Sequence, residues 1–318
     1  MSADVKNYIK SCIKCLQHNP IRRKLDGQLK PIKPPNGIWE LLLMDFHGPI
    51  APMTHHGHKY IIAITDVLSK FVVTRATRDC SAQTVVRFIK EDVICKYGTP
   101  RCILTDNGSH FTSAMTNNLL QQAGITHLYS TPYHPQTNGQ VERYNSTMDA
   151  KIAALSNQQK TDWDEQLPFV TFNHNATVHS TTKQIPFEMV FGRAPKLPFD
   201  RQSEVVSLEQ HPEHITKLKQ YISSLENEAM KNIIKTQQQS KKRYDLHRSN
   251  PVYNLGDLVL VKTINNRRKL DVRYEGPFKI AQRLADKTYI VQHIKKPTLT
   301  KQITVDSIIP IFERLNIS

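Results

Sequence analysis

Short apolar runs alternate with stretches of helical period between residues 39 and 130 of this 318-residue chain. The runs are continuous or alternating in apolar character, which is typical of strands. They cover residues 39–46, 58–69, 70–78, 101–109 and 125–130. Helices are predicted over 81–98, where Ser81 can cap the start and Gly98 the end, and over 113–123. Three successive strands followed by helix-connected strands predict an α/β fold with a mixed sheet, antiparallel in one half and parallel in the other.

The pattern differs on either side of this region. Residues 1–35 contain a short stretch with a helical pattern, followed by a basic, proline-containing linker. Residues 36–198 contain the sheet and two further predicted helices within 162–191. Residues 199–250 lack glycine and predict a long helix with a narrow apolar stripe, able to pair with another helix or to dock on the core. That stripe consists of Ile215, Leu218, Ile222, Leu225, Ala229 and Ile233.

Residues 251–318 return to short strands with little helix between them, which predicts a small antiparallel barrel. The predicted strands are 257–262, 277–284, 287–293 and 302–312.

The composition is that of an ordinary globular protein, with 39% hydrophobic and 22% charged residues. The formal charge of +15 favours a polyanionic partner, most commonly nucleic acid, although charge alone does not distinguish such a protein from a merely basic one. No apolar run approaches the roughly 20 residues that span a bilayer, and the first ten residues lack the apolar stretch of a signal peptide. We therefore expect no membrane association, and the five scattered cysteines indicate a reducing compartment.

Three acids stand out by their positions. Asp45 and Asp106 each close a predicted buried strand, and Glu142 lies in the first turns of a predicted helix. Each alone has a simpler explanation: a turn or cap aspartate, or a glutamate that suits the helix dipole. Together they would repel one another unless divalent cations joined them. Magnesium prefers such oxygen ligands, and a pair of ions supports phosphodiester chemistry.

The residues around these acids carry a family resemblance. Asp45, Asp106 and Glu142, with 35 residues between the last two, resemble the D,D-35-E signature of retroviral and retrotransposon integrases. The flanking stretches TDNGSHF and YHPQTNGQVERYN agree, and the resemblance is greatest to Ty3/gypsy-like integrases over most of the chain. It implies an RNase H-like core with a mixed five-stranded sheet and flanking helices, a helical linker over 199–250 and a small SH3-like C-terminal barrel.

The same resemblance implies a function. The chain would be a DDE polynucleotidyl transferase that trims element DNA at its 3′ ends and joins them to target DNA, using two Mg²⁺ or Mn²⁺ ions held by Asp45, Asp106 and Glu142. It would act as a homo-multimer in the nucleus, and residues 131–138 would form a mobile loop beside the site. The expected DNA-binding residues are Tyr133, His134, Gln136, Asn138, Gln140, Arg143, Lys262, Arg267, Arg268, Lys269 and Arg273.

The N-terminal zinc module of these integrases is represented here by its cysteine half alone. Cys12 and Cys15 are present, His18 is a possible third ligand, and no His or Cys precedes Cys12. Structural zinc sites use four ligands, so we expect no zinc at this place and interpret the chain as N-terminally truncated or as starting late.

Two features compete with this interpretation of the chemistry. THHGHKY at 54–60 has metal-binding residue types, but it lies between two strands, where a polar turn is the favoured explanation. Asp66 also ends a strand, and its flanks fit a hairpin turn. Two other functions stay open: a domesticated DNA- or chromatin-binding protein without catalysis, and an RNase H-type nuclease.

Overall fold

The computed structural model describes residues 11–20, 26–29, 31, 33–129, 135–197, 213–263, 270–285 and 287–311, and for residues 135–144 the backbone alone. The chain divides into two compact units. One comprises residues 31–238, and the other joins residues 1–30 to residues 239–318. None of the described helices is both long and apolar enough to cross a bilayer.

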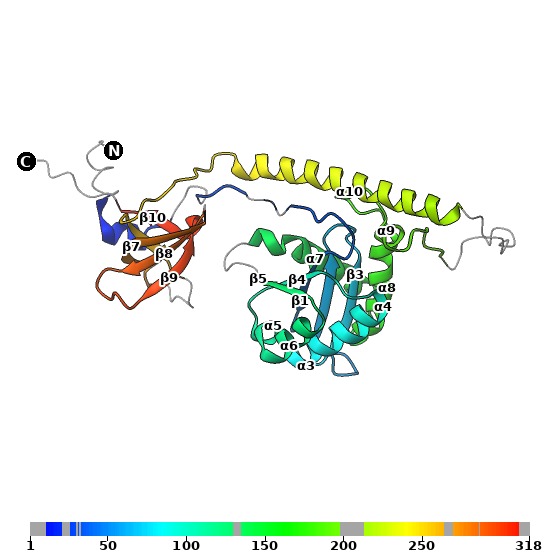
Figure 1. Cartoon of the computed structure of the whole chain (residues 1–318). Coiled ribbons are helices and arrows are strands. Elements are labelled where there is room, and N and C mark those ends of the chain that lie inside the picture. The colour runs from blue at the N-terminus through cyan, green and yellow to red at the C-terminus, as the bar shows by residue number, and fades with distance from the viewer. Residues whose placement is uncertain are drawn as a thin grey trace, which may run out of the picture. The chain divides into compact units, whose positions relative to one another are not determined.

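The larger unit is built on a five-stranded sheet with the strand order β3-β2-β1-β4-β5 (Figure 1). β1 and β2 pair antiparallel, as do β2 and β3, whereas β1–β4 and β4–β5 are parallel pairs. This mixed sheet with flanking helices is the RNase H-like arrangement, so the predicted fold class is confirmed. The strands are β1 Leu41–His47, β2 Tyr60–Asp66, β3 Val72–Thr77, β4 Cys102–Thr105 and β5 Thr126–Tyr129.

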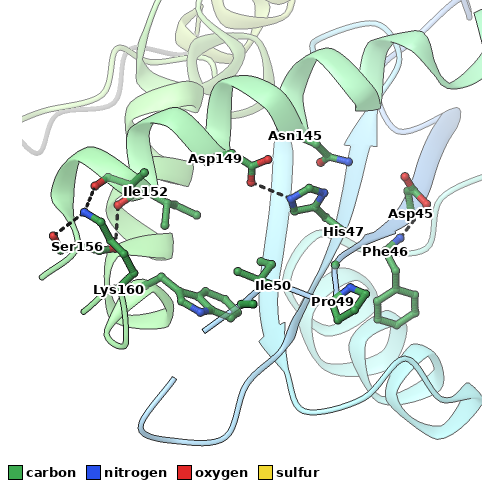
Figure 2. Close-up of a pocket in the computed structure, with 14 residues that line it drawn as sticks. Asp45, Phe46, His47, Pro49, Ile50, Asn145, Asp149, Ile152, Ser156 and Lys160 are labelled. Atoms are coloured by element: carbon green, nitrogen blue, oxygen red, sulfur yellow. Dashed lines mark hydrogen bonds and ion pairs between the residues drawn. The ribbon is translucent and has the colours of Figure 1, made fainter. Parts of the chain in front are cut away.

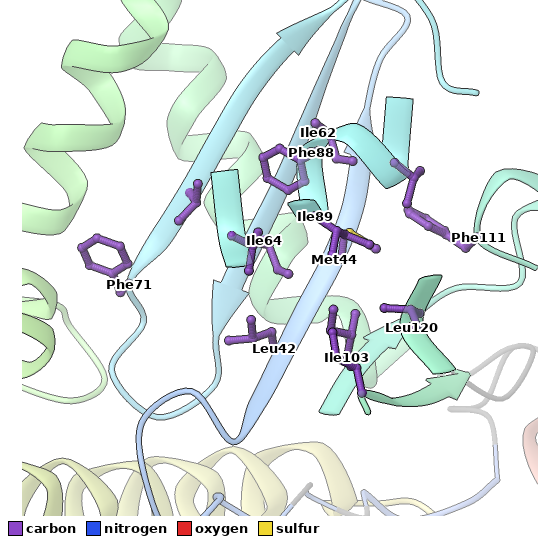
Figure 3. Close-up of a cluster of buried hydrophobic side chains, with 14 residues drawn as sticks. Leu42, Met44, Ile62, Ile64, Phe71, Phe88, Ile89, Ile103, Phe111 and Leu120 are labelled. Atoms are coloured by element: carbon purple, nitrogen blue, oxygen red, sulfur yellow. The ribbon is translucent and has the colours of Figure 1, made fainter. Parts of the chain in front are cut away.

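Alternation along the strands divides the core between the two faces of the sheet. Leu42 and Met44 of β1 point to one face, where they pack with Phe88 and its neighbours from the helices that connect β3 to β5 (Figure 3). These helical segments are α3 Ala82–Phe88, the π-helical η1 Ile89–Ile94, α4 Cys95–Tyr97, α5 Ser109–Thr112 and α6 Ala114–Gln122.

The opposite face is covered by α7 (Pro135–Leu155) and α8 (Trp163–Ala176). Trp163 is 2% exposed there and packs with side chains of the strands and of α7. Its neighbours are Ile61, Ala63, Val72, Met148, Ile152, Leu167 and Val170. Each helix layer therefore buries one face of the sheet, which leaves the edges where strands end for polar residues.

The helical segment after the β2–β3 hairpin, which consists of α3, η1 and α4, begins after Ser81 and ends before Gly98, as predicted. Ser81 is the N-cap of α3, and its Oγ accepts a hydrogen bond of 3.3 Å from the Thr84 amide. Gly98 follows α4 with φ = +88°, a left-handed backbone conformation that favours glycine.

Ser81→Ala is expected to lower the free energy of unfolding by about 1 kcal/mol, because an N-terminal amide of α3 loses its acceptor. Chemical denaturation measures the change. Ser224→Ala, inside the long helix α10 (His214–Asp245), is the matched control and should not destabilise, since alanine has the higher helix propensity. Equal losses in the two variants would contradict a capping role for Ser81.

The long helix α10 (His214–Asp245) docks its apolar stripe on the core of the larger unit rather than on another helix. Leu225, Ala229 and Ile233 pack against Leu68 and Met189. Met189 belongs to the short helix α9 (Pro186–Phe191). Of the two predicted uses of this stripe, docking on the core is the one observed.

The smaller unit contains a second five-stranded sheet, antiparallel throughout, in the order β10-β6-β7-β8-β9. It is consistent with the predicted SH3-like barrel, and its core includes Phe278 and Tyr289, both 0% exposed. The short helix α2 (Ile13–His18) lies on this sheet, where Gln17 Nε2 donates to the Gly276 carbonyl at 3.3 Å. The strands are β6 Leu258–Lys262, β7 Tyr274–Ala285, β8 Thr288–His293, β9 Thr300–Thr304 and β10 Ile308–Pro310.

The prediction of one strand over 302–312 was wrong in one respect. A 3₁₀ turn, η2 (Val305–Ser307), separates β9 from β10. Thr304 Oγ1 donates to the Asp306 carboxylate, a local side-chain bond that competes with strand pairing. The break lets β9 pair with β8 and β10 pair with β6.

Candidate active site

Two aspartates occupy neighbouring strand ends in the larger unit. β1 and β4 run parallel with Leu43 opposite Leu104, so continuing this register by two residues places Asp45 beside Asp106. Neighbouring strands lie about 4.8 Å apart. The parallel pairing of β1 and β4 is therefore compatible with the predicted approach of these two acids.

Asp106 is held by the turn that follows β4. Its Oδ1 accepts a hydrogen bond of 2.9 Å from the Gly108 amide. A Cβ at Gly108 would lie 2.7 Å from His110 Cε1 and 3.0 Å from Asp106 Oδ1, so no larger residue fits here without displacing one of them. The glycine therefore allows the backbone to approach the carboxylate closely.

His110 forms an apolar wall next to Asp106. Its ring meets the Phe46 ring edge-on, with 4.9 Å between centroids. Burial lowers the pKa of His110, although the nearby Asp106 carboxylate acts in the opposite direction. The imidazole is consequently neutral at pH 7 and adds no positive charge that would compete with a cation for Asp106.

Asp45 lies on the face of β1 that is covered by α7. Alternation sends Met44 and Phe46 toward the first core and Asp45 and His47 toward α7. His47 Nε2 is 2.7 Å from Asp149 Oδ1 of that helix. Asp45 Oδ1 accepts a bond of 2.9 Å from the Phe46 amide, which fixes the carboxylate at the rim between β1 and α7.

A cleft of about 540 Å³ lies between the end of β1 and the inner face of α7 (Figure 2). Asn145 is 8% exposed, and its Oδ1 has no hydrogen-bond partner within the described part of the chain. A buried, unpaired amide oxygen in a cleft that also contains Asp45 can act as an additional oxygen ligand for a cation, or accept a hydrogen bond from a substrate hydroxyl. The lining residues are Asp45, Phe46, His47, Gly48, Pro49, Ile50, Ala51, Asn145, Asp149, Ile152, Ala153, Ser156, Lys160 and Trp163.

Glu142 lies on α7 three residues before Asn145, and its side chain is outside the described part of the chain. α7 begins at Pro135, so residues 135–138 of the expected loop are helical, and residues 131–134 lie outside the described ranges. Proline suits the first turn of a helix, where its missing amide would be unpaired in any case. Four of the expected DNA-binding residues therefore lie on α7, and the structure describes only their backbone: Gln136, Asn138, Gln140 and Arg143. Tyr133 and His134 lie outside the described ranges.

The predicted DNA-binding residues of the smaller unit are partly described. Lys262 is exposed at the end of β6. Arg273 is exposed too, and its Nε donates to the His18 carbonyl at 3.1 Å, which connects it to α2. Residues 267–269, the expected hairpin tip, lie outside the described ranges.

The two cysteines of the predicted zinc-module remnant lie at the start of α2. Cys12 is its N-cap, and Cys15 follows within the first turn. A hydrogen bond with Cys12 raises the pKa of the Cys15 thiol.

Asp66 is a structural acid, in agreement with the hairpin interpretation. It is 1% exposed, its Oδ2 accepts bonds from the Ser69 amide at 2.7 Å and the Ser69 hydroxyl at 2.6 Å, and its Oδ1 accepts one from the Trp39 amide at 3.0 Å. Burial raises the pKa of Asp66, opposed by the bonds from Ser69 and Trp39 and by Lys70. These contacts fix the β2–β3 turn.

Sequence reasoning missed His47 as a residue of the cleft. Its position two residues after Asp45 on a strand was the available signal, because residues at i and i+2 share a face. Asp45, Asp106 and the Asn145 amide supply oxygen donors, which is the donor type that Mg²⁺ and Mn²⁺ prefer. The described residues therefore fit a divalent cation.

Comparisons with known proteins agree with this geometry. Residues 33–135 match the integrase core domain. The chain is 28% identical over 285 residues to a retrovirus-related Pol polyprotein from transposon 412 of Drosophila melanogaster, covering 88% of this chain and 23% of that protein. It is 27% identical over 293 residues to the transposon Tf2-3 polyprotein of Schizosaccharomyces pombe, covering 90% and 21%. The chain thus spans about a fifth to a quarter of these relatives.

A solved structure supports the same fold. The chain superimposes on a subunit of the simian T-cell lymphotropic virus intasome, solved in complex with PP2A regulatory subunit B56 gamma, with a TM-score of 0.61. The match covers 98% of this chain and 91% of the other at 15% identity, which shows the fold alone. Together with the two polyproteins, these findings confirm the resemblance to retroelement integrases.

Proposed function

We propose that this chain, which carries an integrase core domain and resembles retroelement integrases, trims the 3′ ends of an element's DNA and joins them to target DNA. One observation supports the proposal: β1 pairs in parallel with β4, the strand that Asp106 follows, and Asp45 of β1 lines a cleft together with residues of α7, the helix that contains Glu142. Carboxylates gathered in this way suit phosphodiester chemistry, which needs no covalent enzyme intermediate.

The three acids have distinct roles in this proposal. Asp45 and Asp106 would jointly hold one Mg²⁺ or Mn²⁺ ion, and Asp45 and Glu142 would hold the other. Ions held in this way would supply positive charge to the attacking and leaving oxygens. Glu142 also orients the attacking water or 3′-hydroxyl. The hydrogen bond from the Gly108 amide keeps the Asp106 carboxylate in position. Because the His110 ring is neutral, it adds no positive charge that would compete with a cation for Asp106.

DNA binding is assigned to two regions. The first surrounds Glu142 in sequence and consists of Tyr133, His134, Gln136, Asn138, Gln140 and Arg143. The net charge of +15 favours a polyanion. Lys262, Arg267, Arg268, Lys269 and Arg273 of the smaller unit contact the phosphate backbone. The chain acts as a homo-multimer in the nucleus, where target DNA is found.

A strand-transfer assay tests the proposal. The purified chain is incubated with duplex oligonucleotides that carry the terminal sequences of the DNA flanking its coding region, together with a supercoiled plasmid. Oligonucleotide–plasmid joints are expected with Mg²⁺ or Mn²⁺ and are expected to disappear on addition of a chelator. Scrambled oligonucleotide ends serve as the control.

Two other outcomes would overturn the proposal in favour of its competitors. Tight DNA binding without any joint under either metal would identify a DNA-binding protein that lacks catalysis. Metal-dependent cleavage of an RNA–DNA hybrid, without joints, would identify an RNase H-type nuclease.

A further inference from the structure

Two histidines of the β1–β2 connection converge on an aspartate of α8. His56 Nδ1 is 2.9 Å and His58 Nδ1 is 2.6 Å from the same oxygen, Asp164 Oδ2. Thr54 Oγ1 donates to that oxygen too, at 3.2 Å. The ligand atoms of His56, His58 and Asp164 all lie within 4.8 Å of one another. The group is thus assembled from two segments that lie more than 100 residues apart in the sequence.

The burial of Asp164 sets this group apart from an ordinary surface ion pair. The Asp164 side chain is 6% exposed, and its second oxygen, Oδ1, is buried and has no hydrogen-bond partner within the described ranges. His56 is 57% exposed, so the group is open to solvent on one side. Three groups contact one oxygen of this buried carboxylate, and the other oxygen has no described partner. An unpaired buried oxygen raises the free energy of the folded state unless a further positive group interacts with it.

We propose that His56, His58 and Asp164 form a binding site for a divalent transition metal, with Zn²⁺ as the ion that fits best. Two imidazole nitrogens and one carboxylate oxygen are donors that zinc accepts, and three protein ligands leave a fourth position for water on the solvent side. A tetrahedral ion about 2.1 Å from each ligand spaces its ligands about 3.4 Å apart. The two separations between histidine and Asp164, 2.9 and 2.6 Å, would open slightly to admit it, and no two ligand atoms lie more than 4.8 Å apart. Mg²⁺, which prefers oxygen ligands, fits this donor set poorly.

The proposed ion would fasten the β1–β2 connection to the start of α8. Trp163 precedes Asp164, lines the cleft and donates from its Nε1 to the Pro52 carbonyl at 3.1 Å. The connection and the helix already meet at this point, and a shared ion would stabilise the contact. The site is separate from the three acids and does not depend on the proposed catalytic function.

Zinc titration of the purified chain by calorimetry tests this site. The Cys12→Ser/Cys15→Ser variant removes the thiols of α2 as competing ligands, and excess Mg²⁺ occupies carboxylate-only sites. We expect one Zn²⁺ per chain and a rise in Tm on addition of Zn²⁺, since a ligand that binds only the folded state stabilises it. His56→Gln and Asp164→Asn, in the same background, should each weaken zinc binding at least tenfold.

His55→Gln is the matched control. His55 is exposed in the same connection, but its Nε2 is bonded to Thr161 Oγ1 at 2.7 Å and it lies outside the group of three. Its substitution should leave zinc affinity unchanged. Because His56 is largely exposed, His56→Gln folds even if Asp164→Asn does not. No saturable zinc binding, or equal affinity in His56→Gln and His55→Gln, would overturn the proposal and leave a hydrogen-bonded cluster.

Discussion

Asp45→Asn is expected to lower the rate of strand transfer at least about a thousandfold, equivalent to about 4 kcal/mol of activation free energy. The amide keeps the size of the side chain but removes the charge that would hold a cation at the end of β1. Folding should be little affected, because this carboxylate accepts a bond from the amide of the next residue, Phe46, and an amide oxygen can accept it equally well. Asp106→Asn is expected to behave in the same way, since its bond from Gly108 can also be kept.

Asp66→Asn is the matched control, because Asp66 ends the neighbouring strand β2 but accepts three hydrogen bonds in a buried turn. An amide places a donor against either the Trp39 amide or the Ser69 amide. Leaving such a buried pair unmatched costs about 1–3 kcal/mol of unfolding free energy. Transfer activity per folded molecule should persist.

Strand-transfer rates and urea denaturation, measured on all three variants, separate the two effects. Asp45→Asn and Asp106→Asn should lose activity at nearly unchanged stability, and Asp66→Asn should lose stability at nearly unchanged activity. Normal transfer by folded Asp45→Asn, or equal DNA affinity together with equal transfer in all three, would remove Asp45 from the catalytic centre.

The sheet and its helices could be predicted because their signals are local. The continuous apolar run around Leu42, the cap at Ser81 and the helix end at Gly98 are signals that act within a few residues, and each is observed. The docking of α10 was predicted only as one of two uses of an apolar stripe. A stripe defines a face to be buried and does not define what buries it.

The parallel pairing of β4 with β1, on which the proposed meeting of Asp45 and Asp106 depends, could not be predicted from spacing alone, because it is a tertiary choice. The resemblance to integrases supplied that choice, and the register agrees with it. The start of α7 at Pro135 was missed because proline marks a helix start as well as a turn.

The group formed by His56, His58 and Asp164 shows the limit of local reasoning. The predicted polar turn is present, with the Gly57 amide donating to the Thr54 carbonyl at 2.9 Å. The acid that gives the two histidines a common partner lies on α8, beyond the reach of any local pattern. The observed turn at residues 54–58 therefore does not exclude the proposed metal site, because the turn supplies the two histidines and α8 supplies the acid.

Trp163→Ala is expected to lower the free energy of unfolding by about 3–5 kcal/mol, the usual cost of truncating a buried aromatic residue. Trp163 is 2% exposed, and it packs α8 against β2 and α7 in the core beneath the cleft. Trp163→Phe should recover most of this loss, because it restores packing but not the bond from Nε1 to the Pro52 carbonyl.

Phe169→Ala on the same helix provides the control, since Phe169 is 68% exposed and its truncation should change stability by no more than about 0.5 kcal/mol. Urea denaturation of the three variants gives the comparison. Because the cleft wall contains Trp163, the alanine variant should also lose strand transfer at temperatures where it remains folded, whereas Phe169→Ala should not. Similar stability losses for Trp163→Ala and Phe169→Ala would mean that α8 does not bury this face against the sheet.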